Sequence, residues 1–117
     1  MPTEKEFAKG YKIHNGLKIG KFILDHFIIN ETTIIKFNHY QYHIELYFKS
    51  DNIVSEDVKQ LEKDLINYIS PNEKTIYTSW GNPYKCLFID KSIPNYRDIH
   101  VSDNYIYLSY MGSSHRI

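Results

Sequence analysis

The sequence predicts an α+β protein. We expect an antiparallel sheet of about six to seven short strands that begins as a β-meander, with one amphipathic helix over about 55–69 packed on one face. Short segments rich in Ile, Tyr and Phe are separated by turn residues, as is typical of strands. Residues 40–48 alternate between apolar and polar, whereas 55–69 carry apolar residues at helical spacing. At 117 residues the chain has the length of one domain, which we place at 1–117.

The first twenty residues predict a short helix and then a hairpin. Thr3 and Glu6 have the spacing of a capping box, so we expect a helical turn over 4–9. Asn15-Gly16 accommodates the positive φ angles of a tight turn and stands between two half-apolar segments. We therefore expect a hairpin centred on this pair within 11–19.

Three strands are expected next, over 21–29, 33–37 and 40–48, with a turn at 30–32 between the first two. In the third strand, side chains on alternate faces separate a core face from a solvent face. The core face is expected to hold Tyr40, Tyr42, Ile44, Leu46 and Phe48. The parity of the apolar positions changes near 38–39, which predicts a turn or bulge there.

The amphipathic helix is expected to begin at Ser55, a good N-cap residue, and to end before Pro71. Its apolar stripe is about 100° wide, the width of a helix face that lies on a sheet. The stripe consists of Val58, Leu61, Leu65, Tyr68 and Ile69.

The remaining strands are predicted at 75–79 and 84–90, followed by a hairpin of 98–101 and 105–110. The segment after it, 112–117, has the small polar residues of a frayed tail.

Charge and hydropathy restrict the function classes. Lys plus Arg and Asp plus Glu are both 14, so the net charge is zero, which argues against a general phosphate-backbone binder. No apolar run reaches the roughly 18–20 residues of a membrane span, so we expect no membrane partner. The charged first ten residues predict no signal peptide and an intracellular location, in the cytoplasm or in the host cytoplasm of a virus. Abundant Ile, Lys, Asn, Tyr and Phe indicate an A/T-rich genome, such as that of some phages and viruses.

The sequence predicts no catalytic residue, no metal and no cofactor. Cys86 lies between apolar neighbours in a predicted strand, which favours a small buried hydrophobe over a nucleophile. His39 and His43 would lie about 13 Å apart along a strand, too far to share one metal ion. Phosphate-binding and dinucleotide-binding glycine motifs are missing from the sequence. Asp98 and His100 would share one strand face, which leaves a small enzyme as an alternative.

The function that the sequence favours is a non-enzymatic accessory protein that binds another protein, such as an accessory protein or inhibitor of a phage or virus. The predicted partner-binding surface is a loop that contains Trp80, Asn82, Pro83 and Tyr84. Pro83 restrains this loop, and a restrained loop presents a tryptophan at little entropic cost. The alternative for Trp80 is a lid that folds back over one end of the core.

Two further binding hypotheses remain open. Tyr47, Lys49, Tyr105 and Tyr107 would form a tyrosine-rich sheet face for single-stranded nucleic acid or a nucleotide. Ser113 and Arg116 in the C-terminal segment are a weak candidate for anion binding.

Overall fold

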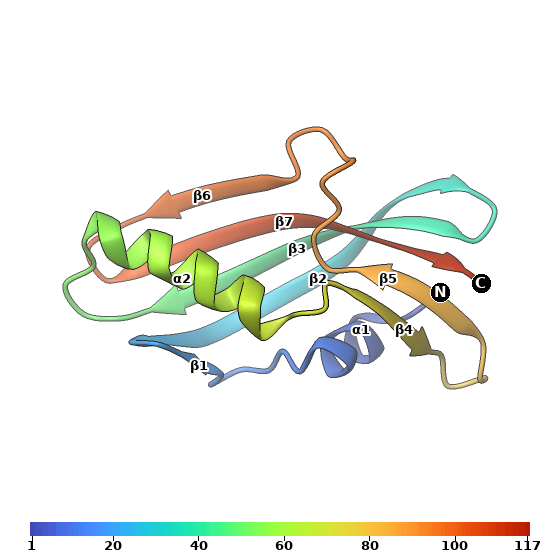
Figure 1. The fold of residues 1–117 in the computed structure, drawn as a ribbon, viewed down its shortest axis with the longest axis horizontal. Coiled ribbons are helices and arrows are strands. Elements are labelled where there is room, and N and C mark those ends of the chain that lie inside the picture. Colours follow the sequence, from blue (N-terminus) through green and yellow to red (C-terminus); the bar gives the residue numbers. More distant parts are fainter.

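The computed structural model describes the backbone of residues 1–117 and every side chain except those of residues 33–35. The described chain forms two helices and an antiparallel sheet of seven strands (Figure 1), which confirms the predicted α+β class with a helix packed on the sheet. Along the chain the elements are α1 (Glu4–Tyr11), β1 (Lys18–Ile19), β2 (Phe22–Lys36), β3 (His39–Lys49), α2 (Ser55–Tyr68), β4 (Glu73–Tyr77), β5 (Pro83–Leu87), β6 (Arg97–Val101) and β7 (Tyr105–Arg116).

The C-terminal strand β7 lies in the middle of the sheet, whose strand order is β1-β2-β3-β7-β5-β4. One edge of β7 pairs with β3 from Tyr105 to His115. Its other edge pairs first with β6 and then, beyond Gly112, with β5. The expectation that 112–117 is a frayed tail is therefore wrong, because most of this segment belongs to a central strand.

A close approach of two backbone segments at Gly112 explains why the end of β7 carries small residues. A Cβ atom at this position would lie 2.7 Å from the Leu87 carbonyl oxygen and 2.9 Å from the Phe88 carbonyl oxygen. The chain that leaves β5 crosses here, and the Asp90 amide donates to the Met111 carbonyl at 2.8 Å. Only glycine allows two backbones to approach so closely. The following Ser113 and Ser114 are also buried.

The two faces of β3 differ as its alternation predicts. Ile44, Leu46 and Phe48 are fully buried, whereas Glu45 and Tyr47 are half-buried on the other face. Both helices pack on the face of Ile44 and its neighbours, so one hydrophobic core lies between the helices and the sheet (Figure 1).

Helix α2 packs through Leu61 and Leu65 of the predicted stripe, which are fully buried, whereas Tyr68 of the same stripe is exposed. The N-cap is Val54 and not Ser55, because the Asp57 carboxylate accepts the Val54 amide at 2.9 Å and also pairs with Lys21 at 3.0 Å. A carboxylate in the first turn of a helix satisfies one of the free amides there and interacts well with the helix dipole.

Helix α1 has the predicted capping box, in which Thr3 and Glu6 exchange hydrogen bonds of 2.9 and 3.2 Å. It continues through Gly10 to Tyr11. A Cβ atom on Gly10 would lie 2.5 Å from the Ile76 side chain, so this glycine allows α1 to approach β4 closely. Over the described residues, neither helix has the length and apolar character needed to cross a membrane.

Two of the predicted reversals differ in the structure. Asn15-Gly16 does form a turn, but the β1–β2 hairpin reverses at Gly20, whose φ angle is 58°. The turn expected at 30–32 is absent from the described backbone, since β2 continues to Lys36 with shifts of register along its length. The chain reverses just before β3, where Asn38 has a φ angle of 61°, as the change of parity predicts. The side chains of residues 33–35, part of the strand expected over 33–37, lie outside the described residues.

The buried position of Leu65 gives a direct test of how α2 packs. Leu65→Ala is expected to lower the free energy of unfolding by about 2–5 kcal/mol, because it leaves a cavity in the core. Chemical denaturation measures this difference, and Ile66→Ala serves as the control because Ile66 is 46% exposed on the same helix. A loss below about 1 kcal/mol for Leu65→Ala would contradict the packing described here.

Candidate binding surfaces

The sheet face opposite the two helices carries a cluster of aromatic and ionisable side chains. Side chains of directly paired residues on antiparallel strands lie on the same face, and the pairing places residues of β2, β3, β6 and β7 together here. We call this surface the open face, and its members are Asp25, His26, His43, Glu45, Tyr47, Lys49, Asp98, His100, Tyr105, Tyr107 and Ser109.

Tyr47 is the centre of the aromatic part of the open face. Its ring stacks on His26 with a centroid distance of 4.1 Å and an interplanar angle of 13°. The rings of Tyr107 and Tyr105 lie 5.1 and 6.2 Å away. His100 on β6 extends the cluster, since its ring lies 5.6 Å from that of Tyr107. The rings that the sequence predicts on one sheet face are therefore brought together.

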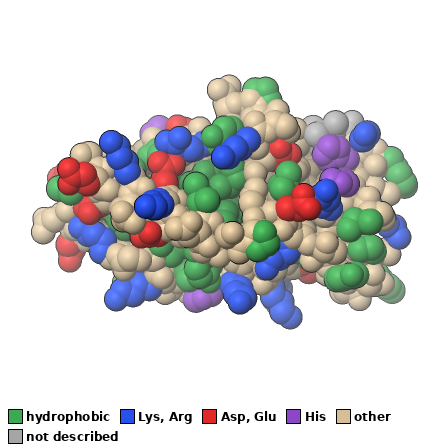
Figure 2. Space-filling view, in the orientation of Figure 1, with side chains coloured by type: hydrophobic (Ala, Val, Ile, Leu, Met, Phe, Trp, Pro, Cys, Tyr) green, Lys and Arg blue, Asp and Glu red, His purple; other side chains and the backbone are tan. Residues whose placement is uncertain are grey.

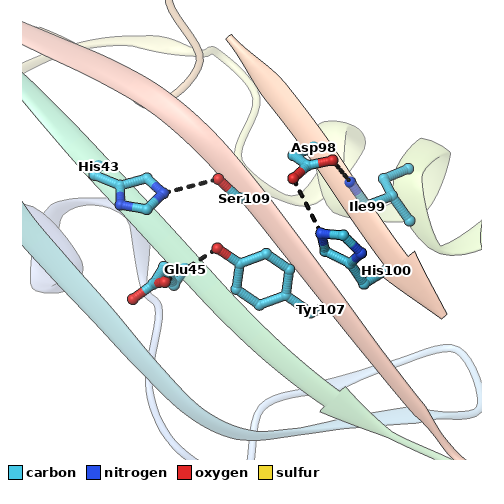
Figure 3. Close-up of polar contacts among 7 residues, drawn as sticks. All are labelled: His43, Glu45, Asp98, Ile99, His100, Tyr107 and Ser109. Atoms are coloured by element: carbon cyan, nitrogen blue, oxygen red, sulfur yellow. Dashed lines mark hydrogen bonds and ion pairs between the residues drawn. The ribbon is translucent and has the colours of Figure 1, made fainter. Parts of the chain in front are cut away.

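Polar contacts join the strands across this face (Figure 3). The Tyr107 hydroxyl donates to Glu45 Oε1 at 3.0 Å, and His43 Nε2 lies 2.9 Å from Ser109 Oγ. On β6, His100 Nε2 lies 3.1 Å from Asp98 Oδ2. Asp98 and His100 thus share one face, as their spacing predicts.

A shift of register in β2 adds Asp25 to the open face beside His26. Asp25 contacts His26 Nδ1 at 2.8 Å and Lys49 Nζ at 3.2 Å. Hydrogen bonds from these two side chains hold the pKa of Asp25 below its usual range. The cation that would attract phosphate in the predicted nucleic-acid face is therefore already paired with a carboxylate.

Negative charge affects the tyrosines of the open face. Partial burial, together with the nearby Glu45 carboxylate, raises the pKa of Tyr47. Tyr105 shows the same effect, in which burial is the larger cause and Asp25 the next. Both tyrosines therefore keep their hydroxyl protons at neutral pH and present neutral rings.

The open face brings one histidine next to a serine. His43 and Ser109 have the spacing of a base and a nucleophile, but Ser109 is only 8% exposed. A working pair also needs a group that orients the histidine and donors for a developing oxyanion. Asp98 and His100 lie on the exposed strand β6, and no described group of three or more His, Cys, Asp or Glu side chains could hold a metal ion.

A second surface lies where the β2–β3 and β4–β5 turns meet the end of β7. Trp80 is 90% exposed and Phe37 is 92% exposed. Arg116 connects their turns, because its amide donates to the Asn38 carbonyl at 3.0 Å and its guanidinium to Asn82 Oδ1 at 2.9 Å. Figure 2 shows hydrophobic side chains at this right-hand end of the molecule. We call it the two-turn end, and its exposed apolar members are Phe37, Tyr77, Trp80 and Ile117.

The turn that carries Trp80 is held by local hydrogen bonds. The Gly81 amide donates to the Thr78 carbonyl at 2.8 Å, and the Thr78 amide donates to the Asn82 carbonyl at 3.0 Å. Gly81 has a φ angle of 83°, a conformation that favours glycine. The exposure of Trp80 shows that it is not a lid over the core.

Other predicted site residues are placed differently. Tyr84 is only 3% exposed and lies in the core, so its side chain does not reach the surface of the Trp80 turn. Ser113 and Arg116 lie three positions apart in β7 and so point to opposite faces of the sheet, where they do not meet. Burial alone would raise the pKa of Asp90, but hydrogen bonds from Ser92 and Ser113 lower it, and this carboxylate disfavours an anion beside Ser113.

Comparison with known proteins gives no relative: no family model, curated protein or solved structure matches this chain.

The burial of Cys86 predicts that it is unreactive in the folded protein. Its side chain is fully buried, and burial raises the pKa of the thiol to about 12. Because the thiolate is the reactive form, a disulfide reagent is expected to label the native chain far more slowly than the urea-unfolded chain. Absorbance of the released thiol measures both rates. Equally fast labelling would show that β5 does not shield this thiol.

Proposed function

We propose that this chain is a non-enzymatic protein that binds another protein through its two-turn end, with Trp80 as the anchor. The observation that supports this most is the 90% exposure of the single tryptophan on a turn fixed by hydrogen bonds. Composition favours an intracellular accessory protein or inhibitor from a phage or virus with an A/T-rich genome, in line with this role.

A tryptophan as exposed as Trp80 contributes more to binding than to folding. Trp80 contributes little burial to folding because it has few neighbours in the core. Tryptophan is among the residues most enriched at the energetic centre of protein interfaces, where a few side chains provide most of the affinity. A fixed turn also reduces the ordering entropy lost on association.

Phe37 strengthens the argument because it is as exposed as Trp80 and lies on the neighbouring turn. Arg116 hydrogen-bonds to both turns, so the two rings are presented by one connected piece of structure. Exposed apolar side chains that gather in one region often mark a contact site. Nucleic acid is a weaker candidate partner, because Arg116 is engaged with Asn82 and the chain has no net positive charge.

Trp80→Ala separates binding from folding. The variant is expected to change the free energy of unfolding by less than about 0.5 kcal/mol, since the side chain is exposed. It should weaken partner binding by about 2 kcal/mol or more, the magnitude of an interface hot spot. The partner is first isolated on immobilised wild-type chain from cells of the source, and its affinity for each variant is then measured by calorimetry.

Two controls make the result specific. Ile66→Ala removes another exposed apolar side chain, on α2, and should leave the affinity unchanged. Trp80 is also the only tryptophan, so its fluorescence should shift to shorter wavelength when the partner covers it. If Trp80→Ala binds the partner as tightly as wild type, and the fluorescence of the wild-type chain does not shift on binding, the two-turn end is excluded as the interface.

A further inference from the structure

The aromatic part of the open face is a sheet surface without a covering element, and its charge identifies the chemistry of an occupant. It lies away from the two-turn end. His39, the first residue of β3, is next to the β2–β3 turn, and Tyr47 is about 26 Å further along this strand. Binding at the open face therefore does not depend on the role of Trp80.

Three carboxylates lie beside the ring cluster. Glu45 contacts the Tyr107 hydroxyl at 3.0 Å, and Asp25 lies 3.5 Å from the Tyr105 hydroxyl. Asp98 contacts His100, whose ring borders that of Tyr107. These carboxylates therefore lie at the edges of the same rings.

Positive charge within the cluster is smaller. Lys49 pairs with Asp25, whereas no lysine or arginine pairs with Glu45 or Asp98 among the ion pairs of the described side chains, and Asp98 contacts only His100 there. The cluster therefore carries excess negative charge although the whole chain has none. A surface of this kind repels phosphate groups and attracts cations.

We propose that the open face binds an arginine-bearing segment of a partner protein, whose guanidinium groups pack against the Tyr107 ring and pair with the Glu45 and Asp98 carboxylates beside it. A guanidinium is planar, stacks on aromatic rings and donates in a fixed geometry that suits carboxylates. Partial burial of the rings strengthens both contacts relative to open water. Lysine has the same charge but neither the plane nor the fixed donors, so it should bind more weakly.

The test uses the blocked peptide Gly-Arg-Gly-Arg-Gly as the probe and amide chemical shifts of the whole chain as the readout. The largest shifts are expected at β3, β6 and β7 near Tyr47, Tyr107 and His100. The peptide with lysine in place of arginine should bind at least about threefold more weakly, and an oligothymidylate should leave these resonances unmoved.

Charge-neutral variants identify the site. Glu45→Gln combined with Asp98→Asn should weaken arginine-peptide binding at least about tenfold, because two carboxylate partners are lost. Asp98→Asn alone should weaken peptide binding less. It is also less disruptive to folding, because β6 is exposed. The dispersion of the amide spectrum reports whether each variant is folded. The matched control is Glu56→Gln with Asp64→Asn, which removes the same charge from α2 and should bind the peptide like wild type.

Several outcomes would overturn the proposal. The proposal fails if the α2 control weakens peptide binding as much as the Glu45 and Asp98 variants, or if the lysine peptide binds as tightly as the arginine peptide. It also fails if the shifts are centred outside the open face, or if the oligothymidylate moves the resonances of these rings. Trp80→Ala should bind the arginine peptide like wild type. The open face is thus tested separately from the two-turn end, whichever of the two proposals fails.

Discussion

The close contact between β7 and the chain leaving β5 is the constraint on which the rest of the structure depends. At Gly112 the Leu87 and Phe88 carbonyls lie where a side chain would otherwise stand. This contact lets one edge of β7 pair with β6 over its first half and with β5 over its second half. β7 thereby joins the β1–β3 meander to β4, β5 and β6, and the helices cover one face of the resulting sheet.

Both candidate surfaces follow from this position of β7. Its first half places Tyr105, Tyr107 and Ser109 in the middle of the open face, between residues of β3 and β6. Its last residues reach the opposite end, where Arg116 fixes the turns that present Phe37 and Trp80. One strand therefore supports an acidic aromatic surface at one end and an apolar surface at the other.

Local patterns in the sequence predict the elements that depend on local physics. The alternation at Ile44 and Leu46 and the helical stripe at Leu61 and Leu65 are each decided by one periodicity, and both predictions are confirmed. The C-terminal segment is mispredicted, because small residues are equally suited to a loose tail and to a crowded crossing. Only the contact of Gly112 with a distant part of the chain distinguishes the two.

The same limit applies to the surfaces. Tyr47, Tyr105 and Tyr107 can be assigned to one face from their parity, and the structure brings them together. His26 and Asp25 cannot be assigned to this face from parity, since their position depends on a shift of register in β2. Tyr84 is predicted at the surface because it is next to the Trp80 turn in the sequence. It lies in the core, because its strand β5 is between β7 and β4 in the sheet.

Amide hydrogen exchange along β7 tests the central position of this strand most directly. The amides of β7 that pair with β3 and β5 should exchange as slowly as those of Ile44 and Leu46, by global unfolding of the chain. Protection should continue past Gly112 to Ser114. Fast exchange from Gly112 onward, at the rate of an unstructured peptide, would contradict a central β7 and the arrangement of both surfaces.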